Sequence, residues 1–179
     1  MNIYLIRHGK TPANEQRLYC GSTDMSLSAD GIAELQTLSY NIRNARFLTS
    51  GMKRTNETLK ILFGDVPFVE DARFREVDFG LFEMHSYEEL KNRADYQQWI
   101  RGDNEANIPP NGESGQQMTE RVLEAFRDIH EDTVLVAHGG VISAIMQYCF
   151  PEQGKHRYAW QPKNGCGYHL SNGTYQTIP

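Results

Sequence analysis

Hydrophobic residues in this chain come in short runs that alternate with longer amphipathic segments. β-Branched and aromatic residues predict strands at 2–6, 46–50 and 133–137. Apolar positions that recur every three or four residues predict helices at 28–42, 52–63, 86–100, 114–129 and 141–149. Strands that alternate with helices are typical of a largely parallel sheet covered by helices.

The C-terminal segment has a different pattern. Residues 165–178 alternate around Ser171-Asn172-Gly173, which predicts a hairpin. We therefore expect an α/β three-layer sandwich: a mostly parallel central sheet flanked by helices, with an antiparallel C-terminal hairpin at one edge. Residues 102–112 hold a proline pair and several asparagines, and they predict a mobile surface excursion. Without internal repeats, residues 1–179 are expected to form a single domain.

Composition and charge limit the classes of partner. The chain has 179 residues and a net charge of −5, so we expect no nucleic-acid partner and a local cationic pocket for any anion. No apolar run is long enough to span a bilayer, and no signal-peptide pattern precedes the first strand. Cys20, Cys149 and Cys166 lack CxxC spacing, which is typical of reduced thiols. We expect a cytoplasmic protein without a membrane partner.

Polar residues follow three of the predicted strands at their carboxyl ends. They are Arg7-His8, the turn from Ser50 to Arg54, and His138-Gly139. If these strands are parallel neighbours, their ends meet at one rim of the sheet, where open α/β folds bind ligands. Arg7 and Arg54 are natural bidentate partners for phosphate or sulfate, and a helix N-terminus at Gly139 would add backbone donors. The sequence therefore predicts an anion site.

Histidines beside such a site indicate phosphoryl chemistry. An imidazole can attack phosphorus and form a covalent intermediate, and a nearby carboxylic acid can protonate the departing alkoxide. Glu76 and Glu83, in the charge-rich and aromatic segment 71–84, are both candidates for that acid. A metal site is the rival use of two histidines and two carboxylates. It is disfavoured because the neighbouring arginines would repel a dication.

Six motifs occur in one order along nearly the whole chain. They are Arg7-His8-Gly9-Lys10-Thr11-Pro12-Ala13-Asn14, 24–31, 50–55, 74–83, Pro110-Asn111-Gly112-Glu113-Ser114 and 134–140. In this order they resemble the histidine phosphatase superfamily, whose members have the phosphoglycerate mutase-like fold. A lone Arg-His-Gly would be a weak signal, but the ordered set is specific.

The resemblance implies a role for each matched polar residue. His8 would be the phosphorylated nucleophile and Glu76 the proton donor, while Glu83 would be structural. The phosphoryl group would be bound by Arg7, Arg54 and His138, with help from Asn14 and the backbone of Gly139. The resemblance implies no metal and no organic cofactor.

The resemblance also favours one reaction over its relatives. The chain is short for a glycolytic mutase, so we expect a phosphomonoester hydrolase acting on a small phosphorylated metabolite. Short members include alpha-ribazole phosphatases and broad-specificity phosphatases. A phosphoglycerate mutase-type phosphotransferase and a non-catalytic phosphoryl-binding protein are the alternatives. Cys20, Thr55 and Met84 depart from the family pattern without removing any catalytic group.

Overall fold

A six-stranded sheet forms the centre of the molecule. The computed structural model describes residues 1–103, 105–153 and 156–179, and the strand count refers to these residues. The strands are β1 Asn2–Arg7, β2 Arg46–Thr49, β3 Val69–Glu70, β4 Thr133–Ala137, β5 Gly167–Ser171 and β6 Thr174–Ile178. Their order across the sheet is β3-β2-β4-β1-β5-β6. β1 to β4 run parallel, and β5 and β6 are antiparallel, which confirms the predicted sheet and its edge hairpin.

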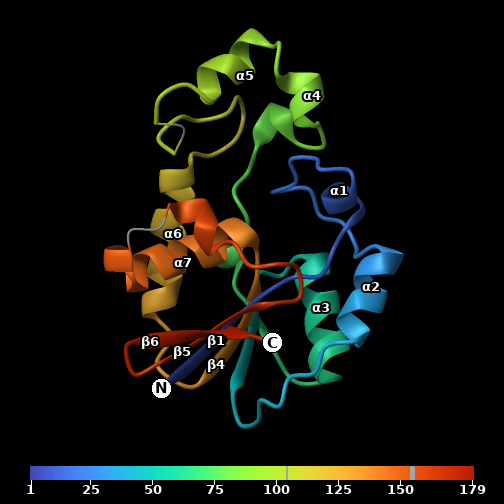
Figure 1. Ribbon diagram of the computed structural model, residues 1–179, viewed down its shortest axis with the longest axis vertical. Helices are drawn as coiled ribbons and strands as arrows, with labels where there is room; N and C mark the ends of the chain where they lie inside the picture. Colours follow the sequence, from blue (N-terminus) through green and yellow to red (C-terminus); the bar gives the residue numbers. More distant parts are fainter. Residues whose placement is uncertain (104, 154–155) are drawn as a thin grey trace.

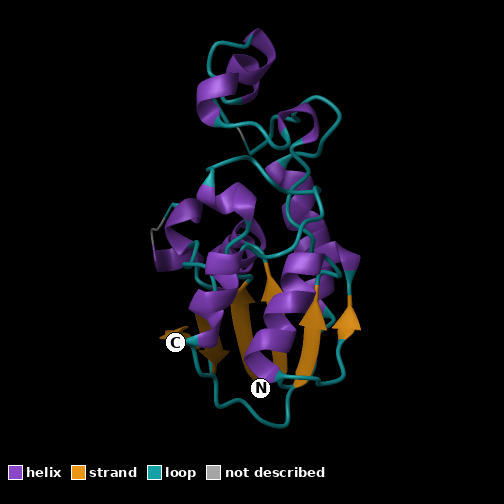
Figure 2. Ribbon diagram, turned by 90° about the vertical axis from the view of Figure 1, so that its right-hand side faces the viewer, coloured by secondary structure: helices purple, strands orange, loops and turns teal. Residues whose placement is uncertain are grey.

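Helices cover both faces of this sheet (Figures 1 and 2). The α-helices are α1 Pro12–Glu15, α2 Ala29–Gln36, α3 Lys53–Phe63, α4 Tyr87–Leu90, α5 Ala94–Trp99, α6 Gly115–Arg127 and α7 Gly139–Cys149. Single 3-10 turns lie at Ala72–Phe74, Gly80–Phe82, Pro151–Gln153 and Arg157–Trp160. In Figure 1, α6 and α7 lie on one side of the sheet and α2 and α3 on the other, while α4 and α5 stand beyond its carboxyl edge. The arrangement is the expected three-layer sandwich.

The position of β4 inside the sheet explains why its sequence is a continuous apolar run. All five residues of β4 are buried because helices cover both of its faces. Leu135 belongs to the cluster on the α6–α7 side, whereas Val134 and Val136 belong to the cluster on the α3 side, with Leu59. Successive side chains point to opposite faces, so one strand supplies both cores.

Two predicted helices are shorter than their patterns indicated. The helix predicted over 28–42 ends at Gln36, although its start is as predicted, with Ser28 as the N-cap. The apolar residues that follow pack on the α3-side cluster from a loop, where the Tyr40 hydroxyl also donates to the Gly165 carbonyl at 2.5 Å. Tertiary packing, rather than continued helix, satisfies these residues.

The helix predicted over 86–100 is interrupted. Ser86 and Glu89 form a capping box that starts α4, but the chain turns after Leu90 and starts again as α5. The break lets Leu90 and Tyr96 pack into one small cluster with Phe82, away from the main core. These two short helices build the cap above the sheet.

The end of the predicted excursion at 102–112 lies against residues 78–81. Residue 104 lies outside the described residues, so the expected mobility stays a prediction. At its end, the Leu81 N–H donates to the Pro110 carbonyl at 2.9 Å, and the Glu113 N–H donates to the Asp78 carbonyl at 3.0 Å. Across the described ranges, no helix is long and apolar enough to cross a membrane.

The buried centre of β4 should dominate stability. Leu135 is fully buried, so Leu135→Ala should lower the free energy of unfolding by about 2–5 kcal/mol through lost burial and a residual cavity. Leu81, 48% exposed, is the matched control, and Leu81→Ala should change stability by less than about 0.5 kcal/mol. Urea denaturation of both variants checks this, and equal losses would contradict the assignment of the core.

Candidate active site

Three neighbouring strands deliver polar residues to one edge of the sheet. β1 and β2 flank β4 in parallel, with Arg7 opposite Ala137 and Thr49 opposite Val136. The residues after these strands therefore meet at the carboxyl rim, as predicted. The structure brings His8 and His138 together there, with ring centroids 5.2 Å apart in an edge-on arrangement.

His8 is held in one tautomer. Its Nδ1 lies 2.6 Å from the Gly9 carbonyl oxygen, which can only accept, so Nδ1 carries the proton. Nε2 is then the unprotonated nitrogen. The backbone is held in turn by the His8 N–H, which donates to the Ala137 carbonyl, and by the Asn164 side chain, which donates to the His8 carbonyl. His8 is only 6% exposed.

His138 is held in the opposite tautomer. Arg54 Nε donates to His138 Nδ1 at 3.3 Å, so Nδ1 accepts and Nε2 carries the proton. That Nε2–H donates to Ser50 Oγ at 2.8 Å, and Ser50 Oγ lies 3.0 Å from Thr55 Oγ1. Thr55, which departs from the family pattern, thus extends the hydrogen-bond chain behind this imidazole.

Arg54 is a buried guanidinium supported by backbone carbonyls. It is 1% exposed, and its Nη1 and Nη2 donate to the Thr23 and Gly21 carbonyl oxygens at 2.8 and 2.7 Å. Each Nη keeps a second N–H that an anion could accept. Glu83 holds the same loop from its other side, because its carboxylate accepts the Gly21, Ser22 and Thr23 N–H groups. This geometry favours a structural role for Glu83.

Arg7 completes the cationic side of the site. Its Nη1 donates to the Pro162 carbonyl at 2.8 Å, and its Nε is buried without a hydrogen-bond partner in the described residues. Burial lowers the pKa of Arg7, and the nearby Glu76 carboxylate opposes that shift. Burial likewise lowers the pKa of Arg54. Both groups still carry their charge near neutral pH.

The two imidazoles are neutral for the same reason. Burial lowers the pKa of His8 well below 6.5, and the charges of Arg54 and Arg7 lower it further. Burial and Arg54 do the same to the pKa of His138. For His8, burial is the larger cause of the lowered pKa, and the two arginines act in the same direction.

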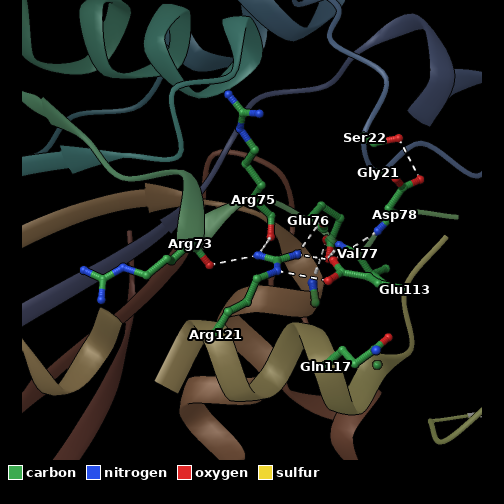
Figure 3. Close-up of polar contacts among 12 residues, drawn as sticks. Gly21, Ser22, Arg73, Arg75, Glu76, Val77, Asp78, Glu113, Gln117 and Arg121 are labelled. Carbon is green, nitrogen blue, oxygen red and sulfur yellow. Dashed lines mark hydrogen bonds and ion pairs between the residues drawn. The ribbon is translucent and has the colours of Figure 1, made fainter. Parts of the chain in front are cut away.

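Glu76 lies at the start of α7 rather than out in solvent. Its Oε2 accepts the Gly140 N–H at 2.9 Å, and its Oε1 accepts the Val77 N–H at 3.0 Å. A Cβ on Gly140 would lie 2.4 Å from Oε1, so a side chain at this position would displace the carboxylate from the helix start. Figure 3 shows the segment that carries Glu76 beside α6, the helix of Arg121.

Asn14 and Gly139 have less direct places. The Asn14 side-chain oxygen accepts from the Thr11 N–H and hydroxyl at 3.0 Å each, which completes the capping box of α1 with Thr11 as the N-cap. Only the Asn14 Nδ2 is left to meet an anion. Gly139 is the first residue of α7, and a Cβ there would lie 2.2 Å from Gln161 Nε2. Gln161 therefore lies directly over the helix start.

Two pockets flank these groups. One of about 410 Å³ contains Glu76 and Gly140 together with aromatic and acidic side chains; it is lined by Tyr19, Phe79, Trp99, Ile100, Glu105, Glu113, Met118, Arg157 and others. The other, of about 610 Å³, contains Arg7, Lys10 and Lys163. Both include Tyr158 and Gln161, which lie between them. Within the described residues, no group of three or more potential metal ligands gathers.

Sequence reasoning missed several members of this site. Ser50 marked a strand end but had no assigned partner, and the helix start was expected to bind an anion, whereas the Gly140 N–H there donates to Glu76. Gln161 and Arg121 carried no signal at all, because each reaches the site from a distant part of the chain. Only contacts between elements reveal them.

Comparison with known proteins places the chain in a family. The model of the histidine phosphatase superfamily (branch 1) matches residues 3–176. The chain belongs to the histidine phosphatase superfamily. The resemblance found in the motifs is thereby confirmed, and with it the expectation of a phosphatase enzyme.

Individual relatives carry two kinds of name. The adenosylcobalamin/alpha-ribazole phosphatase of Salmonella typhimurium is 30% identical over 93% of this chain and 88% of its own length. A probable phosphoglycerate mutase of Salmonella arizonae is 29% identical over 82% of this chain and 73% of its own.

Solved structures have the same fold. The putative alpha-ribazole-5'-P phosphatase of Escherichia coli superposes with a TM-score of 0.85 at 26% identity, covering 99% of this chain and 94% of the other. A phosphoglycerate mutase of Thermus thermophilus has a TM-score of 0.76 at 25% identity, with 96% and 94% covered. These likenesses agree with the phosphoglycerate mutase-like fold expected from the motifs.

The buried neutral histidines should destabilise the protein in mild acid. Below about pH 6.5 the two histidines bind protons in the unfolded chain but stay neutral in the folded one. The free energy of unfolding therefore falls as pH falls, by up to about 1.4 kcal/mol per pH unit for each histidine. Carboxylates with lowered pKa, such as Asp71, lose their contribution only at lower pH. Urea unfolding between about pH 7 and 5 should show this slope, and His8→Asn and His138→Asn should each remove about half of it. An unchanged slope in both variants would contradict the neutral pair.

Proposed function

We propose that this protein is a phosphomonoester hydrolase that works through a phosphohistidine at His8 on a small phosphorylated metabolite. The observation that carries this is a buried imidazole kept neutral beside two guanidiniums, because a nucleophile for phosphorus must be unprotonated and its target is anionic. In this proposal the phosphoryl group is bound by Arg7, Arg54 and His138, with the side chain of Asn14 and the backbone of Gly139 assisting. His138 takes part by turning its Nε2–H from Ser50 Oγ to a phosphoryl oxygen. Glu76 is the acid.

The first step forms the phosphoenzyme. His8 Nε2 attacks phosphorus while the bond from phosphorus to the alcohol oxygen breaks. The proton on Nδ1 stays hydrogen-bonded to the Gly9 carbonyl, which stabilises the positive charge that develops on the ring. The Glu76 carboxylic acid gives its proton to the departing oxygen, so the leaving group is a neutral alcohol.

The second step returns the enzyme to its starting state. Glu76 is now a carboxylate and takes a proton from the attacking water, whose oxygen bonds to phosphorus as the bond to His8 breaks. Inorganic phosphate leaves and His8 is again neutral. One carboxyl group thus serves as acid and then as base, and no redox step or metal ion is required.

The pocket beside Glu76 supports an uncharged, planar alcohol. Tyr19, Phe79 and Trp99 offer aromatic faces for stacking. Arg157, the cation in the lining, is already paired with Glu105, so the lining offers no unpaired cation to a second anion. Alpha-ribazole phosphate, after which these relatives are named, carries such an alcohol and is the substrate we propose.

A phosphotransferase of the phosphoglycerate mutase type is the second candidate. The pocket on the Arg7 side favours it, because Lys10 and Lys163 there could meet a carboxylate. Lys10 is engaged by Glu34, however, and this pocket lies away from the acid. A binding protein without catalysis is less favoured, since binding alone gives no reason to hold Glu76 at the start of α7.

The remaining expectations belong to the same proposal. We place residues 1–179 in one catalytic domain that works in the cytoplasm. The acidic net charge of −5 supports a partner that is a small metabolite rather than a nucleic acid. The local concentration of cations around His8 lets an acidic protein bind an anion.

His8 should be required for turnover. The protein should hydrolyse p-nitrophenyl phosphate in the presence of EDTA, and His8→Ala should lower kcat by more than about 1,000-fold. An alkaline quench should trap phosphate on His8, detected by mass spectrometry. His130→Ala, at an exposed histidine, is the control and should keep full activity. Turnover that needs added metal, or that survives His8→Ala, would refute the mechanism.

The aromatic pocket should select the alcohol. Trp99→Ala should lower kcat/KM for alpha-ribazole phosphate by about 10-fold, through lost stacking, and change that for glycerol 2-phosphate by less than about 3-fold. Equal losses on both substrates would contradict the pocket's assignment. Incubation with 3-phosphoglycerate separates the two candidates, because isomerisation faster than phosphate release would favour the mutase.

A further inference from the structure

The acid lies on a segment that has no regular structure of its own. Residues 75–79 lie between two 3-10 turns, outside any helix or strand. General acid catalysis nevertheless demands a carboxyl group placed within hydrogen-bond reach of the leaving oxygen. The contacts of the Glu76 carboxylate with Val77 and Gly140 orient its oxygens but leave the position of the backbone open. Another element must hold this segment.

Arg121 of α6 supplies that support. Its Nη1 donates to the Arg73 and Arg75 carbonyl oxygens at 2.8 and 2.7 Å, and its Nη2 donates to the Glu76 carbonyl at 3.0 Å. Its Nη2 and Nε also contact the two oxygens of the Glu113 carboxylate. The five N–H donors of the Arg121 guanidinium thus meet five acceptors. Figure 3 shows Arg121 and Glu113 beside residues 75–79, which we call the acid segment.

Glu113 also holds the acid segment, and we call Arg121 and Glu113 together the bracket. Glu113 belongs to the motif Pro110–Ser114, to which no role in phosphate binding was assigned. Its N–H donates to the Asp78 carbonyl at 3.0 Å, and its Oε1 accepts the Asp78 N–H at 3.3 Å. The next residue, Ser114, caps α6. The motif from Pro110 to Ser114 therefore links the start of α6 to the acid segment through Glu113. Arg121, eight residues after Glu113, contacts the same segment from within the helix.

We propose that Arg121, with Glu113, is a positioning residue for the general acid. α6 holds the Glu76 backbone through Arg121, while α7 holds its carboxylate through the Gly140 N–H. The acid is fixed between the two helices, so its distance from the leaving oxygen depends on the bracket. This inference rests on the proposed role of Glu76, and it assigns Arg121 no contact with substrate.

A pair of substrates that differ in leaving group separates this role from a purely structural one. 4-Nitrophenyl phosphate releases an acidic phenol that needs little protonation, whereas 4-nitrobenzyl phosphate has nearly the same shape and releases an alcohol that needs the acid. Arg121→Met should lower kcat for the benzyl ester by about 10- to 100-fold and for the phenyl ester by less than about 3-fold. Arg121→Lys, which restores charge but only three donors, should recover part of the loss.

Double-mutant and control variants complete the test. In a Glu76→Gln background, Arg121→Met should cost less than about 2-fold more on the benzyl ester, because both changes remove one function. Arg127→Met is the matched control on the same helix: Arg127 lies over the Tyr148 ring, and its loss should leave both rates unchanged. Circular dichroism and thermal melting establish that each variant is folded, with Arg121→Lys as the milder change if Arg121→Met is not.

Each outcome decides between the two proposals. Selective loss on the benzyl ester with non-additivity supports the positioning role. Equal loss on both esters, no loss, or an additive loss in the Glu76→Gln background overturns it. If Glu76→Gln itself slows both esters equally, the assignment of Glu76 as the acid fails, and this inference fails with it.

Discussion

Two guanidiniums and two imidazoles lie buried together at the carboxyl edge of the sheet, and the surrounding structure offsets the cost of removing them from water. Backbone carbonyls and a hydroxyl accept from these groups, which leaves few buried donors unsatisfied. Each imidazole is neutral and carries one proton, so the cluster has the charge of two arginines rather than of four cations. That is the state a phosphohistidine mechanism needs: a cationic cradle around a neutral nucleophile.

The same device appears twice around this cluster. Glu83 accepts N–H groups from the loop at 21–23, and Arg54 donates to the carbonyls of that loop. On the other side, Arg121 donates to carbonyls of the acid segment, and Glu113 exchanges bonds with Asp78. In each case, ionised side chains fix an irregular stretch of backbone from both of its polar sides. Catalytic groups on loops thereby acquire the placement that strands and helices give elsewhere.

The cap and the buried histidine pair are separate parts of the structure. α4 and α5 stand beyond the sheet edge (Figure 1). Trp99, the last residue of α5, lines the same pocket as Glu76. The proposed nucleophile His8, by contrast, directly follows β1 and is buried. Changes in the cap can therefore alter the alcohol that fits without disturbing the phosphoryl site.

Local pattern was enough for the framework of this protein. Strand β4, the cap at Ser114 and the Asn172-Gly173 hairpin each follow from short-range chemistry: a continuous apolar run, a side-chain acceptor at a helix start, and residues that tolerate positive φ. His8 and His138 were also identified from sequence, because parallel strands bring their carboxyl ends to one rim. Helix lengths were not, since Tyr40 left its predicted helix for a contact with Gly165, more than a hundred residues away. Arg121 is the clearest case. In the sequence it is indistinguishable from an ordinary surface cation of a helix. Only the packing of α6 against residues 73–78 brings its guanidinium to the backbone carbonyls of the segment that carries Glu76. Contacts of this kind depend on the relative placement of distant elements, which periodicity and propensity along the chain do not encode.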